Sequence, residues 1–313
     1  MKTRENGMRF VFENPPMRRA LKKVLTACIA FSILALNGDT SLAGSIEIPP
    51  GEIGLSIGNS KRFTGLRINA VDHSVEDVKG VNITFWRAGE NKTASYNGLS
   101  IGVIAPEGGD LTGFQVGGLG VAAKSDLSGV SLGLLGVGAG HDVSGLSFGF
   151  LGVGAGHDVT GISIGGLGVG TGHDITGLSF GLLGVGAGHD VTGVSIGGIA
   201  SAAGSDITGI SFGGIAAAAG GDLRGISIGG FGSGCGKDLT GATIALGMVK
   251  AEKGQLTGLA ASAYNWLGDV KGCSVGIVNI SDNLYGVQLG LINIVKNQSG
   301  IKRILPLINW NFK

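Results

Sequence analysis

Cysteine, proline and charge are all scarce in this chain, and each scarcity excludes a class of protein. Only 3 cysteines and 6 prolines occur in 313 residues. The few cysteines exclude a disulfide-built scaffold, and collagen is excluded because no Gly-X-Y triplet runs through the chain. Charged residues make up 14% of the chain and hydrophobic residues 43%. Disordered segments show the opposite balance, so the chain is expected to fold. Beyond residue 43, 16 basic residues stand against 19 acidic ones, which argues against nucleic acid or an anionic membrane surface as a partner.

Glycine is abundant instead, with 63 residues, and an aspartate recurs at a constant interval of 16 residues. The nine aspartates are Asp110, Asp126, Asp142, Asp158, Asp174, Asp190, Asp206, Asp222 and Asp238. A fixed period of this length indicates that one small unit stacks on copies of itself. The sequence therefore predicts architecture more directly than chemistry.

The repeat extends beyond the aspartates over nearly the whole chain. A glycine at the fourth position of each unit recurs from Gly65 to Gly300, with spacings of 16 residues in the middle and 14 near the C-terminus, which gives about sixteen units. We divide the chain into a signal peptide (1–43), irregular N-terminal repeats that form a cap (44–109), regular 16-residue repeats (110–241), and C-terminal repeats with a second cap (242–313).

The apolar residues of each unit predict two short strands joined at a corner. In the unit from Asp158 to His173, Ile162 and Ile164 are two residues apart, as are Leu167 and Val169. The step between the pairs is three, so one continuous strand would direct them to opposite faces. A turn at Gly165-Gly166 would direct both pairs to a common interior. This pattern favours an all-β β-solenoid of 14–18-residue coils; a 16-stranded outer-membrane β-barrel is the alternative.

Two further columns follow from this interpretation. We expect the phenylalanines at positions 148, 180 and 212 to alternate with Ile164, Ile196 and Ile228 at one inward position. The serines of the repeated Gly-x-Ser-x-Gly segments, such as Ser163 and Ser195, are then expected to point outward. Seven copies of that segment in a helix-poor chain do not provide the single strained serine of a hydrolase. The sequence thus offers no catalytic residue, and we expect no enzyme.

The aspartate column allows two interpretations. Each Asp can accept hydrogen bonds from backbone N–H groups two residues further on, as in an Asx-turn. The alternative is calcium, because Gly186-Ala187-Gly188-His189-Asp190 partly matches a calcium-binding repeat. The match fails at Val185 and Thr192, and the period differs. We therefore expect no cofactor, with calcium as the alternative for this column.

Four histidines precede four successive aspartates and form a candidate metal ladder. The pairs are His141 with Asp142, His157 with Asp158, His173 with Asp174, and His189 with Asp190. Neighbouring units carry Ser125, Ser205 and Lys237 at the histidine position. That tolerance favours an exposed turn position over a metal site. Cys235 and Cys273 fall at different positions of units about three apart, and we expect them to be free thiols.

The N-terminus has the pattern of a secretory signal peptide. Basic residues from Arg18 to Lys23 precede an apolar run from Val24 to Leu36, and Ser41-Leu42-Ala43 gives a cleavage site before Gly44. We therefore expect the chain to be exported.

The C-terminal units carry a resemblance to a known family. Gly276-Ile277-Val278-Asn279-Ile280 and the segment from Gly286 to Ile294 (GVQLGLINI) resemble the G-x-Q-x-G-L-x-N surface-repeat proteins of Gram-negative bacteria. The resemblance implies a protein of the cell surface or outer membrane and supplies no catalytic residues. The function we expect is structural, adhesive or interactive, with self-association or contact with envelope components; a barrel channel is the alternative.

Overall fold

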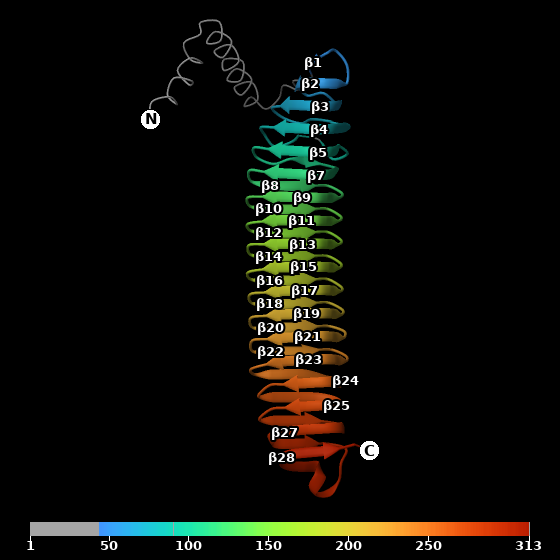
Figure 1. Cartoon of the computed structure of the whole chain (residues 1–313), viewed down its shortest axis with the longest axis vertical. Helices are drawn as coiled ribbons and strands as arrows, with labels where there is room; N and C mark the ends of the chain where they lie inside the picture. Colours follow the sequence, from blue (N-terminus) through green and yellow to red (C-terminus); the bar gives the residue numbers. More distant parts are fainter. Residues whose placement is uncertain (1–43, 90, 313) are drawn as a thin grey trace, which may run out of the picture.

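The chain folds into a long stack of β-coils, seen in a computed structural model that describes residues 44–89 and 91–312. The predicted signal peptide, residues 1–43, lies outside the described residues. Figure 1 shows the coils stacked along one axis, with the two ends of the described chain at opposite ends of the rod. Within the described part of the chain, no helix has both the length and the hydropathy of a membrane span.

Each regular coil has one long and one short strand. The long strands are β2 (Ile53–Gly58), β3 (Arg62–Asn69), β4 (Asp77–Thr84), β5 (Ser95–Gly102), β7 (Asp110–Gly117), β9 (Leu127–Gly133), β11 (Val143–Gly149), β13 (Val159–Gly165), β15 (Ile175–Gly181), β17 (Val191–Gly197), β19 (Ile207–Gly213), β21 (Leu223–Gly229) and β23 (Leu239–Ala245). The short strands are β6 (Glu107–Gly108), β8 (Gly120–Ala123), β10 (Gly136–Ala139), β12 (Gly152–Ala155), β14 (Gly168–Thr171), β16 (Gly184–Ala187), β18 (Ala200–Ala203), β20 (Ala216–Ala219), β22 (Gly232–Cys235) and β26 (Val278–Ser281).

The ends of the rod depart from this plan. Near the C-terminus, β24 (Met248–Ala261), β25 (Tyr264–Val275) and β27 (Asn283–Val295) each run through both positions of a coil. The first strand, β1 (Ser45–Ile48), and the last, β28 (Ile304–Asn311), pair antiparallel with their neighbours. A 3₁₀ turn, η1 (Gly300–Arg303), precedes β28. These reversed strands end the parallel stack at both ends, which keeps another chain from extending it in the same pattern.

The pairing confirms the predicted β-solenoid. Long strands pair in parallel with long strands one coil away, as β11 does with β9 and β13, and short strands pair in the same way. In a transmembrane barrel, neighbouring strands are antiparallel, so the barrel alternative is wrong. The coils form about 14 turns. Gly300, expected in a further unit, instead belongs to η1, and β28 then turns back.

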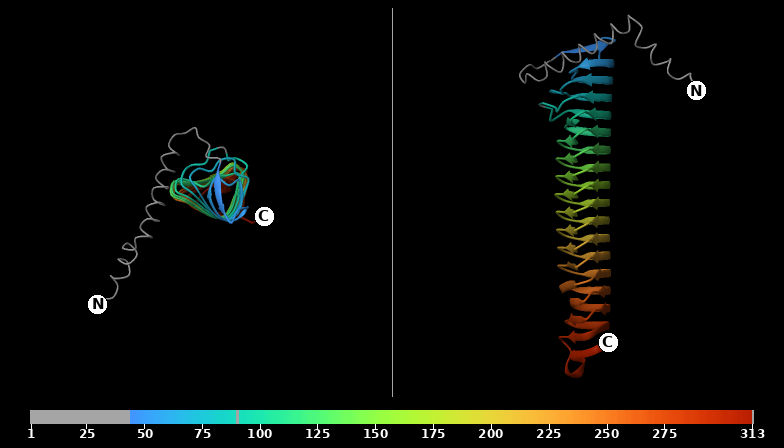
Figure 2. Two further views of the ribbon diagram at one scale, coloured as in Figure 1. Left: turned by 90° about the horizontal axis from the view of Figure 1, so that it is seen from above. Right: turned by 90° about the vertical axis from the view of Figure 1, so that its left-hand side faces the viewer.

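Every long strand bends at its fourth-position glycine. In β13 this is Gly161, whose φ is +109°, and a Cβ there would lie 2.3 Å from the carbonyl oxygen of Gly145 in the preceding coil. The bend leaves Thr160 and Ile162 both outward while Val159 and Ser163 both face inward. Together with the short strand, it gives the coil three sides, and Figure 2 shows the resulting triangular outline from above.

The core is a thin column inside this triangle. It is built mainly from the second residue of each coil, such as Val159 and Ile175, and from the middle of each short strand, such as Val169, all at most 3% exposed. Burying a side chain of this size contributes roughly 1.5–3 kcal/mol. Because each coil repeats the same contacts, the core is continuous along the rod.

Candidate functional site

The outward side of the long strands, beyond the glycine bend, is apolar along the whole rod. We call this surface the apolar face, and call each strand's pair of outward residues a rung. One column, in order along the rod, is Ile48, Leu55, Leu66, Val81, Leu99, Phe114, Val130, Leu146, Ile162, Leu178, Val194, Ile210, Ile226, Ala242, Leu259, Cys273, Val287 and Trp310. The other is Ile46, Ile57, Ile68, Ile83, Ile101, Val116, Leu132, Phe148, Ile164, Phe180, Ile196, Phe212, Ile228, Ile244, Ala261, Val275, Leu289 and Ile308.

No residue of either column is polar, and none is buried. Ile162 is 44% exposed and Phe180 is 40% exposed. The corner after each long strand adds more apolar surface, including Leu167 at 44% and Leu182 at 59% exposed. Eighteen rungs at a spacing of about 4.8 Å extend roughly 80 Å. Soluble monomers rarely expose apolar patches beyond a few hundred Å², so a surface of this length is a candidate interaction site.

This arrangement reverses the predicted inside and outside. Ile162, Ile164 and Leu167 were expected in the interior and lie on the outside; of the two predicted pairs only Val169 is buried. The alternating Phe and Ile column, including Phe148 and Ile196, likewise faces outward. The cause is space: a Cβ on Gly165 would lie 1.9 Å from the carbonyl oxygen of Gly168. The corner between the two strands is therefore too narrow for large side chains.

Small polar side chains fill that narrow part of the interior. The serines expected to point outward are buried, with Ser163 at 1% and Ser195 at 0% exposed. The Ser195 hydroxyl lies 2.7 Å from that of Ser201 on the neighbouring short strand. A buried hydroxyl in a row of copies has no access to substrate, which supports a structural interpretation of the Gly-x-Ser-x-Gly segments.

The aspartate column links one coil to the next instead of closing turns within a coil. Each Oδ1 accepts a hydrogen bond from the backbone N–H of the Asp in the following coil, at distances from 3.3 Å for Asp110 to 2.7 Å for Asp206. The ladder continues past the repeats, since Gln255 donates its N–H to Asp238 at 2.7 Å. The predicted bond to an N–H two residues further on is therefore wrong. The carboxylates of Asp142, Asp158, Asp174 and Asp190 each serve in this ladder.

The four histidines form a stack along one edge of the rod. The ring centroids of His141, His157, His173 and His189 are 4.8–4.9 Å apart, and the rings are nearly parallel. Parallel rings at the coil spacing project in the same direction and do not converge on one ion. Among the described residues, no group of three or more His, Cys, Asp or Glu side chains is arranged to hold a metal.

A polar network that the sequence analysis missed lies beside the apolar core in the first coils. Arg67 is fully buried and donates to Asp72 Oδ1 at 2.6 Å and to Asn82 Oδ1 at 2.7 Å. Tyr96 donates its hydroxyl to Asp72 Oδ2 at 2.9 Å. Burial alone would raise the pKa of Asp72, but the Arg67 charge and hydrogen bonds from Asn69 and Thr84 outweigh it and lower that pKa below 3.8. Burial, followed by the negative Asp72, raises the pKa of Tyr96 well above 10, so its hydroxyl remains a donor.

This network predicts an acid-sensitive N-terminal end. Because folding lowers the pKa of Asp72, its contribution is complete above about pH 4 and is lost as the pH falls below the ordinary value of 3.8. Asp72→Asn leaves Arg67 buried without its counter-charge and should destabilise the first coils by about 3–5 kcal/mol at pH 7. Hydrogen exchange of residues 62–102 between pH 3 and pH 7 measures both effects.

Asp77→Asn is the matched control for this prediction. Asp77 forms an exposed ion pair with Lys79 at 2.9 Å, and exposed pairs contribute little. Equal exchange in the two variants at pH 7 would contradict a stabilising role for the buried pair.

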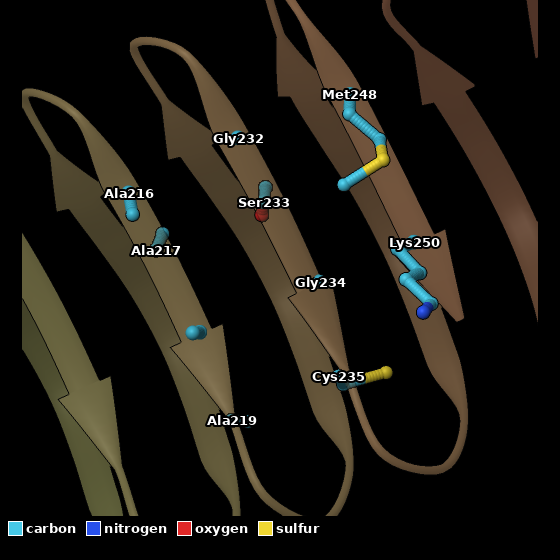
Figure 3. A pocket seen from close by; sticks show the side chains of 10 residues that line it. Ala216, Ala217, Ala219, Gly232, Ser233, Gly234, Cys235, Met248 and Lys250 are labelled. Atoms are coloured by element: carbon cyan, nitrogen blue, oxygen red, sulfur yellow. The ribbon is translucent and has the colours of Figure 1, made fainter. Parts of the chain in front are cut away.

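A shallow hollow lies on the outward side of the short strands. Gly232 and Gly234 lie between the small side chains of β20 and the longer Met248 and Lys250 of β24, and Figure 3 shows the gap that results. Cys235 at its rim is a free thiol, as expected, and so is Cys273. Burial raises the pKa of Cys235 to about 11, with a smaller contribution from Asp222. The thiol is therefore protonated at neutral pH and is a poor nucleophile.

Comparison with known protein families, with curated proteins and with solved structures gives no match for this chain. The candidate site is thus defined by geometry alone. It is the apolar face, since the aspartates and the buried Arg67–Asp72 pair have structural partners within the described residues and the interior serines are closed off from solvent.

Proposed function

We propose that this chain is an exported, non-enzymatic repeat protein whose rod provides an extended interaction surface in the cell envelope. The observation that carries the proposal is the apolar face: eighteen rungs without one polar side chain. In isolation such a surface is a liability for aggregation. A partner that covers it removes that liability.

Two sequence features support the place of action. The basic and apolar pattern before Gly44 is that of a cleaved export signal. The segment from Gly286 to Ile294 resembles surface repeats of Gram-negative bacteria. In the fold, its Asn293 belongs to a buried ladder, in which Asn279 donates its side-chain N–H to Asn293 Oδ1 at 2.8 Å. That asparagine stabilises the coil and carries no ligand chemistry of its own.

The test uses Gram-negative cells that express the full chain. We expect mass spectrometry of the recovered protein to find Gly44 as its first residue. Chemical crosslinking should recover the protein in a larger envelope complex. Replacing Phe148, Phe180 and Phe212 with lysine should abolish that complex, because a lysine on the apolar face is left without water or a counter-charge when a partner covers it.

The matched control replaces Thr176, Thr192 and Thr208 with lysine. These threonines are exposed on the long strands before the glycine bend, on another side of the coil. The control variant carries the same added charge and should still enter the complex. Two results would show that the proposal is wrong. One is a chain that stays in the cytoplasm with residues 1–43 still attached, and the other is a complex that survives the Phe changes.

A further inference from the structure

We propose that the partner of the apolar face is the same face of a second copy of this chain, packed antiparallel about a two-fold axis between the rungs of Ile164 and Phe180. The inference rests on the proposed function, because it names the partner for the same surface. It follows from the area of that surface, the spacing of its rungs, the alternation of large and small side chains on it, and its lack of charge.

The size suits a dimer. A strip about 80 Å long and roughly 11 Å wide would cover roughly 900 Å² on each copy, from the strand spacing and the rise along a strand. The pair would then bury roughly 1,800 Å², within the range of about 1,200–2,000 Å² for stable protein interfaces. A small protein or peptide would cover only part of the strip.

The pitch suits a second copy better than an unrelated protein. Neighbouring coils are about 4.8 Å apart, as the centroid distance between His157 and His173 shows. Side chains on a facing surface remain in register over eighteen rungs only if that surface has the same pitch. Another copy of this solenoid has that pitch along its full length.

The alternation of large and small side chains on the apolar face favours antiparallel pairing. In the middle of the second column, phenylalanine alternates with isoleucine, so every second rung is bulkier. Eighteen rungs place the midpoint of the rod between two rungs, with nine on each side. Rotation about that point sets Phe180 opposite Ile164 and Phe148 opposite Ile196. It also sets Phe212 opposite Leu132.

Parallel pairing would not achieve this fit. It would bring two phenylalanines to the same level at every second rung and none to the level between. The two sheets would then need two different separations along one flat interface, which close packing does not allow. Antiparallel pairing instead distributes one bulky ring to each level of the central rungs.

A lipid surface fits the face less well. The chain beyond residue 43 has 16 basic and 19 acidic residues, and only Lys124, Arg224 and Lys237 are basic between residues 110 and 241. Segments that lie in a membrane interface usually carry rows of Lys or Arg beside their apolar side. Here the neighbouring side carries threonines such as Thr176 and Thr192.

The first experiment measures the mass of the protein in solution. Protein purified from cells that express the full chain is expected to be a dimer by sedimentation equilibrium. F148K/F180K/F212K should raise the dimer dissociation constant at least about tenfold, since buried aromatic residues dominate such interfaces. T176K/T192K/T208K should leave it unchanged. Far-UV circular dichroism confirms that both variants keep their strands, because all six side chains are on the outside of the coil.

A second experiment measures the orientation. In a C235A/C273V background, spin labels are attached at Thr176→Cys, beside the axis, or at Lys271→Cys, six rungs further along. The antiparallel pair predicts that the two Lys271 labels are roughly 60 Å further apart along the rod than they would be in a parallel pair, from the rung spacing. Equal label distances at the two sites would overturn the antiparallel arrangement.

The outcomes separate this inference from the proposed function. A monomer that binds phosphatidylcholine vesicles, or a dimer that survives the Phe changes, overturns the inference. A monomer in solution combined with an envelope complex that depends on Phe148, Phe180 and Phe212 overturns self-pairing and leaves the proposed function intact. A dimer in solution without any envelope complex supports self-pairing and overturns the proposed function.

Discussion

Val191→Asp is expected to unfold the central coils, while Ile196→Asp, five residues away on the same strand, is expected to leave them folded. Val191 is 2% exposed and lies in the continuous core, whereas Ile196 lies on the apolar face. The first change buries a carboxylate that has no cation within the core of these coils. The second leaves the carboxylate in water when the chain is a monomer.

The expected difference is large. A buried, unpaired charge belongs to the small class of substitutions that cost more than about 4 kcal/mol. In a solenoid this loss interrupts the stack, because each coil contacts only its neighbours. Thermal unfolding followed by circular dichroism, at a concentration low enough to keep the chain monomeric, gives the comparison. Equal melting temperatures for the two variants would contradict the assignment of inside and outside.

The repeat and the solenoid were predictable, but the direction of each strand's side chains was not. The 16-residue spacing of Asp158 and Asp174 indicates stacking by itself. Alternation of Ile162, Ser163 and Ile164 shows only that the two isoleucines share one face. Assigning that face to the interior assumes that apolar residues are buried, and here the narrow corner at Gly165 accepts serine instead.

The candidate site was obscured by the same assumption. A column of eighteen apolar residues has the pattern of a buried core. The bend at Gly161 reverses this, because it places Val159 in the interior and leaves Ile162 on the outside. The sequence contained one signal against that assumption, at the position between the two apolar columns. Arg67, Asn82 and Gln115 occupy there the place that serine holds in the regular coils. The pairing of Arg67 with Asp72 depends on an irregular loop, and periodicity does not predict it.

Gly177→Val is expected to disrupt the rod, whereas Gly186→Ala, one short strand later, is expected to be tolerated. Gly177 has a φ of +119°, and a Cβ there would lie 2.2 Å from the carbonyl oxygen of Gly161 in the preceding coil. A β-branched residue is strained in that conformation, and the clash is with backbone, which cannot rotate away. A Cβ on Gly186 meets no atom within 4 Å, and Ala202 already occupies the equivalent place in the next coil.

Gly177 is thus required by its backbone conformation, whereas nothing around Gly186 requires glycine. The two variants test this difference. The strain at Gly177 costs about 1–3 kcal/mol before any clash is counted, and moving the strand to relieve the clash breaks its pairing with both neighbours, β13 and β17. Gly186→Ala should raise stability by about 0.4–1 kcal/mol, because alanine restricts the unfolded chain. Chemical denaturation of both variants measures the difference. An equal loss of unfolding free energy at the two sites would mean that the outward side of the short strands also needs glycine for folding. A stable Gly186→Ala chain would mean that the coil does not require glycine at that position.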